Sequence, residues 1–176
     1  MIAAPIQLQT DPLTDLAERH AAGVFRYLRS LVGDGETARD LLQDTFVRLQ
    51  PHAAEAGPGL VFTTARHCAL DHLRQRRSRG AVVTGIETQA LESVAADQTQ
   101  QPDHSLENSE LREDLLEALA ALPEDQRSVF HLSEIEGLPY DEIAEILSVS
   151  PGTIASRKHH AVRKLREDLR RRGHGA

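Results

Sequence analysis

The residues of this chain best suited to chemistry lie between positions 150 and 163, and the chemistry they suit is nucleic-acid binding. Hydroxyl, guanidinium and ammonium groups there can donate hydrogen bonds to phosphates and base edges. Ser150 and Pro151 are typical of a helix start, because serine accepts from free N–H groups and proline needs no donor in the first turn. The candidate DNA-contacting residues are Ser150, Pro151, Thr153, Ala155, Ser156, Arg157, Lys158, His160 and Arg163.

A preceding helix, predicted over 139–147, would position this segment. Its Ile143 and Ala144 share one face, and alanine is small enough for another helix to pack closely on it. Residues 148–150 break the pattern. Ile154, which belongs to the next helix, points back towards the protein core. Two short helices with a tight turn between them predict a helix-turn-helix whose second helix enters the major groove.

A second basic group lies in the helix predicted over 60–79. Arg66, Arg74 and Arg77 fall along one stripe of this helix, while Cys68 is among the residues that can face inward. The arginines at its end also favour the negative pole of the helix dipole. The pattern alone therefore allows two interpretations of these arginines, phosphate binding and stabilisation of the helix end.

A helix that follows the turn at 33–36 has an unusual outer face. Its exposed stripe combines two carboxylates, an amide and an apolar group, namely Asp40, Gln43, Asp44 and Val47. Such a stripe suits docking of a protein partner. A solvated polar face with one exposed valine is an equally good interpretation.

The net charge of −7 hides an uneven distribution of charge along the chain. Residues 51–90 and 151–176 are both basic, whereas residues 91–150 hold fifteen acidic groups and only Arg112 and Arg127 as cations. The acidic segment would repel a phosphate backbone, and the basic blocks would attract one. Two basic patches separated by an acidic segment are thus expected.

The composition predicts an all-α fold of two small helical domains joined by a flexible acidic linker, the second domain containing the helix-turn-helix. Aromatic residues make up only 3% of the 176, so the cores must be built from Leu, Val, Ile and Ala, which suits helix bundles. The expected divisions are a domain at 1–80, a linker at 81–104 and a domain at 105–176. Further helices are expected from Pro12 to Gly33, from Ser105 to Leu122 with an apolar stripe of Leu111, Leu115, Leu119 and Leu122, and from Glu124 to Glu136.

Other classes of function find little support. Cys68 and His72 have one-turn helical spacing, but two further metal ligands are not evident. The chain has neither a Gly-rich phosphate loop nor a nucleophile elbow. The single cysteine, the lack of an apolar run of membrane-spanning length and the lack of a signal peptide predict a cytoplasmic protein. We therefore expect no enzyme activity, no cofactor and no metal.

Three segments together resemble a known family. "VGDGETARDLLQDTFVRL" and "FTTARHCALDHLRQRRSR" are similar to conserved region two of the extracytoplasmic-function sigma factors of bacterial RNA polymerase. "LPEDQRSVFHLSEIEGLPYDEIAEILSVSPGTIASR" is similar to region four of the same family. The segments occur in the family's order, with a linker between them, and cover nearly the whole chain.

The resemblance implies a function for each patch. The stripe Asp40, Leu41, Gln43, Asp44 and Val47 would dock on the beta-prime clamp helices of the polymerase, and the second domain would meet the beta flap. The minus-ten promoter element would be opened by Arg66, His67, Asp71, Arg74, Arg76 and Arg77. The predicted groove helix would read the minus-thirty-five element. An anti-sigma factor, often a membrane-bound protein, is the other implied partner.

Some positions depart from the family pattern. His67 replaces the Asn associated with the flipped minus-ten base, His160 replaces an arginine of the recognition helix, and Ala155 occupies an often basic position. Ser148 stands where such turns commonly have glycine, which predicts an unusual turn or modest strain. The rival hypothesis is a polymerase-independent regulator with a sensing or dimerisation domain at its N-terminus. The docking stripe and the arginine-rich helix argue against that hypothesis.

Overall fold

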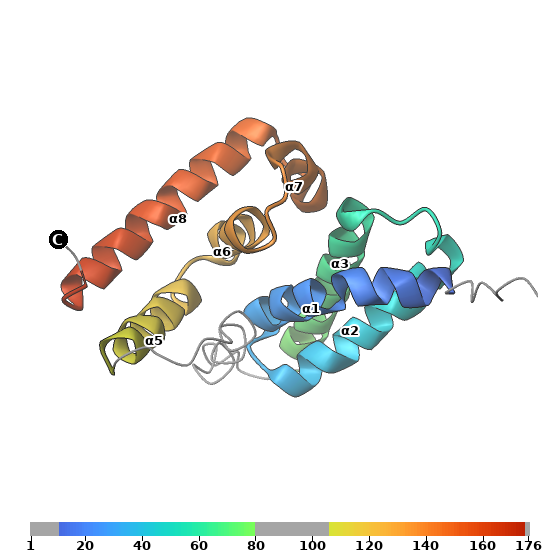
Figure 1. Cartoon of the computed structure of the whole chain (residues 1–176), viewed down its shortest axis with the longest axis horizontal. Coiled ribbons are helices and arrows are strands. Elements are labelled where there is room, and N and C mark those ends of the chain that lie inside the picture. The colour runs from blue at the N-terminus through green and yellow to red at the C-terminus, as the bar shows by residue number, and fades with distance from the viewer. Residues whose placement is uncertain (1–10, 80–105, 175–176) are drawn as a thin grey trace, which may run out of the picture.

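A computed structural model describes residues 11–79 and 106–174, and all the regular structure in these two ranges is helical. Figure 1 shows the helices in two groups, which we call the N-terminal lobe (α1 to α3) and the C-terminal lobe (α5 to α8). The N-terminal lobe comprises α1 (Pro12–Val32), α2 (Gly35–Leu49), the 3-10 turn η1 (Gln50–His52) and α3 (Pro58–Ser78). The C-terminal lobe comprises α5 (Leu106–Ala120), α6 (Glu124–Phe130), the π-helical turn η2 (His131–Ile135), α7 (Tyr140–Leu147) and α8 (Pro151–Arg171).

Local signals set the helix ends of the N-terminal lobe. Gly33 ends α1 in the left-handed conformation, with φ of 81°, and its N–H donates to the carbonyl of Arg29. Asp34 then caps α2 by accepting from the Thr37 N–H at 2.7 Å. Hydrogen bonds to Thr37 hold the pKa of Asp34 below its usual value. The expected helix from Pro12 to Gly33 is thus confirmed almost to the residue.

The helix-turn-helix forms as predicted. Its turn includes Ser148, whose φ of 54° places it in the left-handed region that glycine usually fills. Ser150 caps α8 by accepting from the Thr153 N–H at 3.2 Å, and Pro151 occupies the first turn. Ile154 is fully buried, as the pattern indicated.

The C-terminal lobe has a second small core where α5 packs against α8. It consists of Ala118, Leu122, Ala161 and Leu165, with Leu119 and Phe130 packed against it. Arg172, just after α8, pairs with Asp114 and Glu117 of α5 at 2.6 Å each. The far end of α8 is therefore fastened to α5.

Two sequence expectations need correction. Leu111 is 39% exposed, whereas Leu116, outside the predicted stripe, is 5% exposed. Leu119 and Leu122 of the predicted stripe do belong to the α5–α8 core, which Ala118 joins because its small side chain lets α8 approach closely. The helix expected over 60–79 begins earlier, because α3 already starts at Pro58. The predicted linker 81–104 and the Ser105 cap lie outside the described residues.

The two lobes pack against each other. Figure 1 shows α6 beside α1 and α7 beside α3, and residue contacts join both pairs. One apolar cluster contains Leu28 and Ala65 of the N-terminal lobe together with Leu132 and Ile143 of the C-terminal lobe. Within the described ranges, none of the helices combines the length and apolar character needed to span a membrane.

Candidate nucleic-acid and protein-binding surfaces

The start of α8 presents small polar groups to the surface. Ser150, Pro151, Ala155, Ser156 and His160 are exposed, and Thr153 is half-buried. The hydroxyl oxygens of Ser150 and Thr153 lie 2.9 Å apart, so the two groups share a hydrogen bond. This end of α8 leaves a surface of hydroxyl and imidazole groups free to meet base edges.

The two cations at the start of α8, Arg157 and Lys158, form ion pairs within their own lobe. Arg157 points back to α6, where its Nε lies 3.1 Å from the Asp125 carboxylate. Lys158 pairs with Glu134 of η2, and its ammonium lies 5.3 Å from the centre of the Tyr140 ring. The hydrogen bond to Glu134 raises the pKa of Lys158. Both side chains are only 27% exposed, so neither is a freely extended groove contact.

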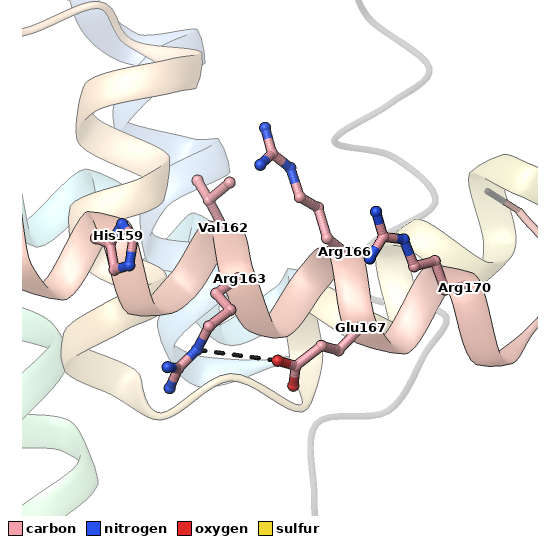
Figure 2. Close-up of a pocket in the computed structure, with 6 residues that line it drawn as sticks. All are labelled: His159, Val162, Arg163, Arg166, Glu167 and Arg170. Carbon is pink, nitrogen blue, oxygen red and sulfur yellow. Dashed lines mark ion pairs between the residues drawn. The ribbon is translucent and has the colours of Figure 1, made fainter. Parts of the chain in front are cut away.

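A basic stripe continues along α8 beyond the candidate residues. Figure 2 shows a shallow hollow on this face, lined by His159, Val162, Arg163, Arg166, Glu167 and Arg170. Arg163 pairs with Glu167 at 3.9 Å and also lies 3.4 Å from the Nδ1 of His160. Sequence reasoning named only Arg163 from this stripe. The spacing of 159, 163, 166 and 170 is the signal that would have identified the rest.

The arginines of α3 differ in how far their side chains are exposed to solvent. Arg74 and Arg77 are exposed and Arg76 is half-buried. Arg66, by contrast, is 16% exposed, because its Nη1 lies 3.0 Å from the Glu124 carboxylate of the C-terminal lobe. Asp71 pairs with Arg74 at 3.2 Å and with Arg48 of α2 at 3.7 Å, and His67 is exposed.

The outer face of α2 forms a separate surface. Asp40, Gln43 and Asp44 are exposed, and Val47 is 66% exposed, the highest value among the large apolar side chains described. Leu41, which shared the sequence candidate list, is only 6% exposed and packs in the core. The stripe therefore offers two carboxylates, an amide and one apolar group to a partner.

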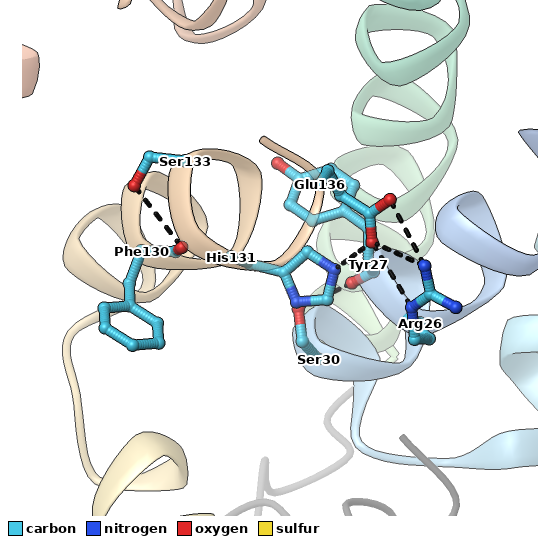
Figure 3. A network of polar contacts seen from close by, with 7 residues as sticks. All are labelled: Arg26, Tyr27, Ser30, Phe130, His131, Ser133 and Glu136. Atoms are coloured by element: carbon cyan, nitrogen blue, oxygen red, sulfur yellow. Dashed lines mark hydrogen bonds and ion pairs between the residues drawn. The ribbon is translucent and has the colours of Figure 1, made fainter. Parts of the chain in front are cut away.

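A polar network that sequence reasoning missed lies between the lobes. Figure 3 shows Glu136, which follows η2, between Arg26 of α1 and His131. Burial lowers the pKa of His131, so its imidazole is neutral near pH 7. Burial alone would raise the pKa of Glu136, but its hydrogen bonds to His131 and Arg26 bring it below its usual value. No local pattern marks the pairing of Arg26 with Glu136, because the two residues are 110 positions apart.

Nothing in residues 11–79 and 106–174 gathers three His, Cys, Asp or Glu side chains in an arrangement that could hold a metal ion. Cys68 is buried in α3, and burial raises the pKa of its thiol. His72 is half-buried on the same helix.

Comparison with known proteins matches both lobes to models of one family. Residues 16–79 match the model described as Sigma-70 region 2, and residues 112–165 match the model described as Sigma-70, region 4. The matches follow the order of the lobes and include α3, the α2 stripe and the helix-turn-helix.

Relatives match over nearly the whole chain. RNA polymerase sigma factor CarQ of Myxococcus xanthus is 36% identical over 164 residues, which are 90% of this chain and 90% of CarQ. ECF RNA polymerase sigma factor SigL of Mycobacterium tuberculosis is 32% identical over 165 residues, covering 90% of this chain and 89% of SigL. Among solved structures, the sigma factor RpoE in complex with the anti-sigma factor NepR, from Bartonella quintana, has a TM-score of 0.62. It is 26% identical and covers 88% of this chain and 94% of RpoE.

Proposed function

Because this chain belongs to the extracytoplasmic-function sigma factors of the sigma-70 family, we propose that it binds core RNA polymerase and directs promoter-specific initiation of transcription. The observation that carries the proposal is the presence of both sigma regions, in order, in one chain with full-length relatives. Sigma factors are initiation factors and not enzymes, and we extend that property to this chain.

The two lobes divide the promoter between them. The start of α8 reads the minus-thirty-five element through Ser150, Thr153 and Ser156, while Arg157, Lys158 and Arg163 supply positive charge. The exposed arginines of α3 neutralise phosphates near the minus-ten element, where a base leaves the stack at a cost of a few kcal/mol. His67 stands at the position that meets the extruded base.

The α2 stripe contacts the polymerase itself. Asp40 and Asp44 supply charge and Val47 supplies apolar area, and this combination fits the beta-prime clamp helices. The C-terminal lobe meets the beta flap. Leu41 supports the stripe from the core and is not a contact.

In-vitro transcription tests the proposal. Purified protein is added to core polymerase with a library of genomic promoter fragments, and transcript starts are mapped. We expect initiation at a restricted set of sites only when both proteins are present. The absence of any protein-dependent start would refute the proposal, and binding to duplex DNA without core would then favour the polymerase-independent regulator.

An anti-sigma factor is the expected negative regulator. The structural neighbour RpoE was solved with the anti-sigma factor NepR, and its likeness to this chain extends over both lobes. We propose that this chain acts in the cytoplasm and is held inactive there by a protein that binds both lobes. Co-purification from the native host, followed by mass spectrometry, would identify that partner.

A further inference from the structure

The cations in the two halves of α8 differ in whether a carboxylate of the lobe already holds them. In the first half, Arg157 and Lys158 pair with carboxylates of α6 and η2, and both cations are only 27% exposed. In the second half, Arg166 and Arg170 are exposed, and neither has a hydrogen-bond or ion-pair partner in the described ranges. The unpaired arginines of α8 therefore lie beyond the segment that we propose reads the minus-thirty-five element.

The unpaired arginines share a face of the helix with residues proposed to meet DNA. Ser156, Arg163 and Arg170 follow one another at intervals of seven residues, close to two helical turns, so their side chains point the same way. Ala161 and Leu165 lie on the opposite face, where both are buried. The surface that faces DNA at the start of α8 therefore continues to the far end of the helix.

These side chains surround the shallow hollow of Figure 2, which has a volume of about 240 Å³. Arg166 extends on one side of the hollow, and the pair of Arg163 and Glu167 lies on the other. Arg163 and Glu167 are both 61% exposed with their closest charged atoms 3.9 Å apart, so the pair is loose. Glu167 is the one carboxylate among the residues that line the hollow. Guanidinium groups on two sides of a hollow can donate to the oxygens of one phosphate.

The length of α8 carries these arginines past the groove. The segment 150–160 covers about 15 Å at ~1.5 Å per residue, whereas the major groove is about 12 Å wide. Along the helix axis from Ser156, Arg166 lies about 15 Å away and Arg170 about 21 Å away. Because a helix does not follow the winding groove, the second half of α8 reaches the sugar-phosphate backbone that borders the bases being read.

The composition of this face favours phosphate over a protein partner. Protein interfaces depend on a few large apolar or aromatic anchors. The large apolar side chains that are exposed in the described ranges are Val47, Leu60, Leu111 and Tyr140, and none of them lies on α8. Val162, the apolar residue of the hollow, is half-buried. An arginine-rich face with little apolar area suits the DNA backbone, which is bound mainly through charge.

We propose that Arg166 and Arg170, together with Arg163, form a phosphate-binding site for the DNA backbone that flanks the minus-thirty-five element. This inference rests on the proposed function, and it adds contacts outside the bases that the start of α8 reads. Such contacts carry no sequence information, but they fix the position and orientation of the helix on the duplex. Arg166 and Arg170 need no carboxylate to leave before they bind, so they are available to duplex DNA of any sequence.

The salt dependence of promoter binding tests this site. Holoenzyme assembled from core polymerase and the full chain is titrated against a mapped promoter fragment, by fluorescence anisotropy, between about 50 and about 200 mM salt. Arg166→Gln with Arg170→Gln should reduce the slope of log affinity against log salt by about 1.8, at ~0.9 for each lost phosphate contact. The advantage of the parent protein should then shrink about twelvefold over that range of salt. Circular dichroism should show unchanged helices, because both arginines are exposed.

Two adjacent arginines provide the matched control. Arg170→Gln and Arg171→Gln each remove one positive charge, but consecutive residues lie about 100° apart around a helix, and Arg171 pairs with Asp168. We expect Arg170→Gln to reduce the salt slope by about 0.9 and Arg171→Gln to leave it unchanged. The glutamine amide can still donate to Asp168, so the control keeps that contact. Arg166→Lys with Arg170→Lys retains both charges and should keep the slope of the parent protein.

Neutral phosphates locate the site on the duplex. Single methylphosphonate linkages are placed in turn on either side of the minus-thirty-five element, and binding is measured as before. The parent protein should lose affinity severalfold at a few positions outside the element, whereas the variant with Arg166→Gln and Arg170→Gln should not respond at those positions. Changing the base sequence at the same positions should leave the affinity of both proteins unchanged, because phosphate contacts do not read bases.

The outcomes separate this site from the proposed function. An unchanged salt slope for the double glutamine variant, or equal responses of parent and variant to every methylphosphonate, would overturn the phosphate site. A variant that binds DNA like the parent but initiates less well when a second protein is present would assign the face to a protein partner, and the proposal would be wrong. Initiation by the parent protein while the site fails leaves the proposed function standing. If the parent gives no transcript starts with core polymerase, the same titrations with the protein alone on duplex DNA still decide the site.

Discussion

Arg157 gives the sharpest test of how α8 meets DNA, because its guanidinium is paired within its own lobe. Its Nε lies 3.1 Å from the Asp125 carboxylate, and the two side chains are 27% and 40% exposed. A pair this exposed contributes about 0.2–1 kcal/mol. DNA must displace Asp125 before Arg157 can bind phosphate, so Asp125→Asn should tighten promoter binding by about 1.4- to 5-fold, at ~1.4 kcal/mol per tenfold.

The assay is fluorescence anisotropy of holoenzyme binding to a promoter fragment mapped by the transcription experiment, repeated over a range of salt concentrations. Arg157→Ala should weaken binding and reduce the slope of log affinity against log salt by about 0.9, the value for one lost phosphate contact. Asp141→Asn is the matched control, because it removes one exposed negative charge from the same lobe without touching Arg157.

Two results together would refute this reasoning. One is equal binding by Asp125→Asn and Asp141→Asn, and the other is an unchanged salt slope for Arg157→Ala. Arg157 would then serve only to pack α8 against α6, and the positive charge on the groove would have to come from elsewhere on the helix.

Four further predictions follow from the same surfaces. Asp40→Lys with Asp44→Lys should abolish co-purification with core polymerase while the thermal midpoint stays within a few degrees, because both carboxylates are exposed. Since burial lowers the pKa of His131, the unfolded chain binds more protons, and the urea midpoint should fall as pH drops below about 6.5, less so in His131→Asn. Ser150→Ala should cost about 1 kcal/mol in urea unfolding, because the N–H of Thr153 loses its cap. His160→Arg should tighten promoter binding at pH 7.5 and steepen its salt dependence, and unchanged binding would place His160 away from DNA.

Sequence reasoning succeeded where the determinant was local. The end of α1 at Gly33 and the start of α8 at Ser150 and Pro151 depend on backbone groups within four residues, so the pattern alone located them. The turn at Ser148 was expected to be unusual, and its left-handed backbone confirms this. Helix ends of this kind are predictable because the hydrogen bonds that fix them close over one turn.

The same reasoning failed where burial came from a distant segment. Leu111 and Leu116 are both apolar residues of one helix, yet Leu111 is 39% exposed and Leu116 is 5% exposed. His131 and Arg127 are polar residues that no apolar pattern placed in the core, yet both are buried. For His131 the cause is α1, whose position relative to η2 no local periodicity encodes. A pattern reports which face of a helix is apolar, and it does not report which partner will cover that face.

The acidic segment has a different role from the one its composition indicated. Its charges were expected to keep that surface away from phosphate, but six of the described carboxylates pair with cations of this chain. Asp114 and Glu117 pair with Arg172, and the other pairs are Glu124 with Arg66, Asp125 with Arg157, Glu134 with Lys158 and Glu136 with Arg26.

These pairs differ in what must move before DNA can replace the carboxylate. Asp125 and Glu134 belong to the same lobe as the cations they hold, so rotation of exposed side chains is enough to free Arg157 and Lys158. Glu124 holds a cation of the other lobe, so the Arg66 pair depends on how α6 lies against the N-terminal lobe. Arg66 thus differs from Arg157 and Lys158, whose pairs are set within one lobe. The α2 stripe, which we propose as the docking surface for polymerase, is exposed in the same arrangement.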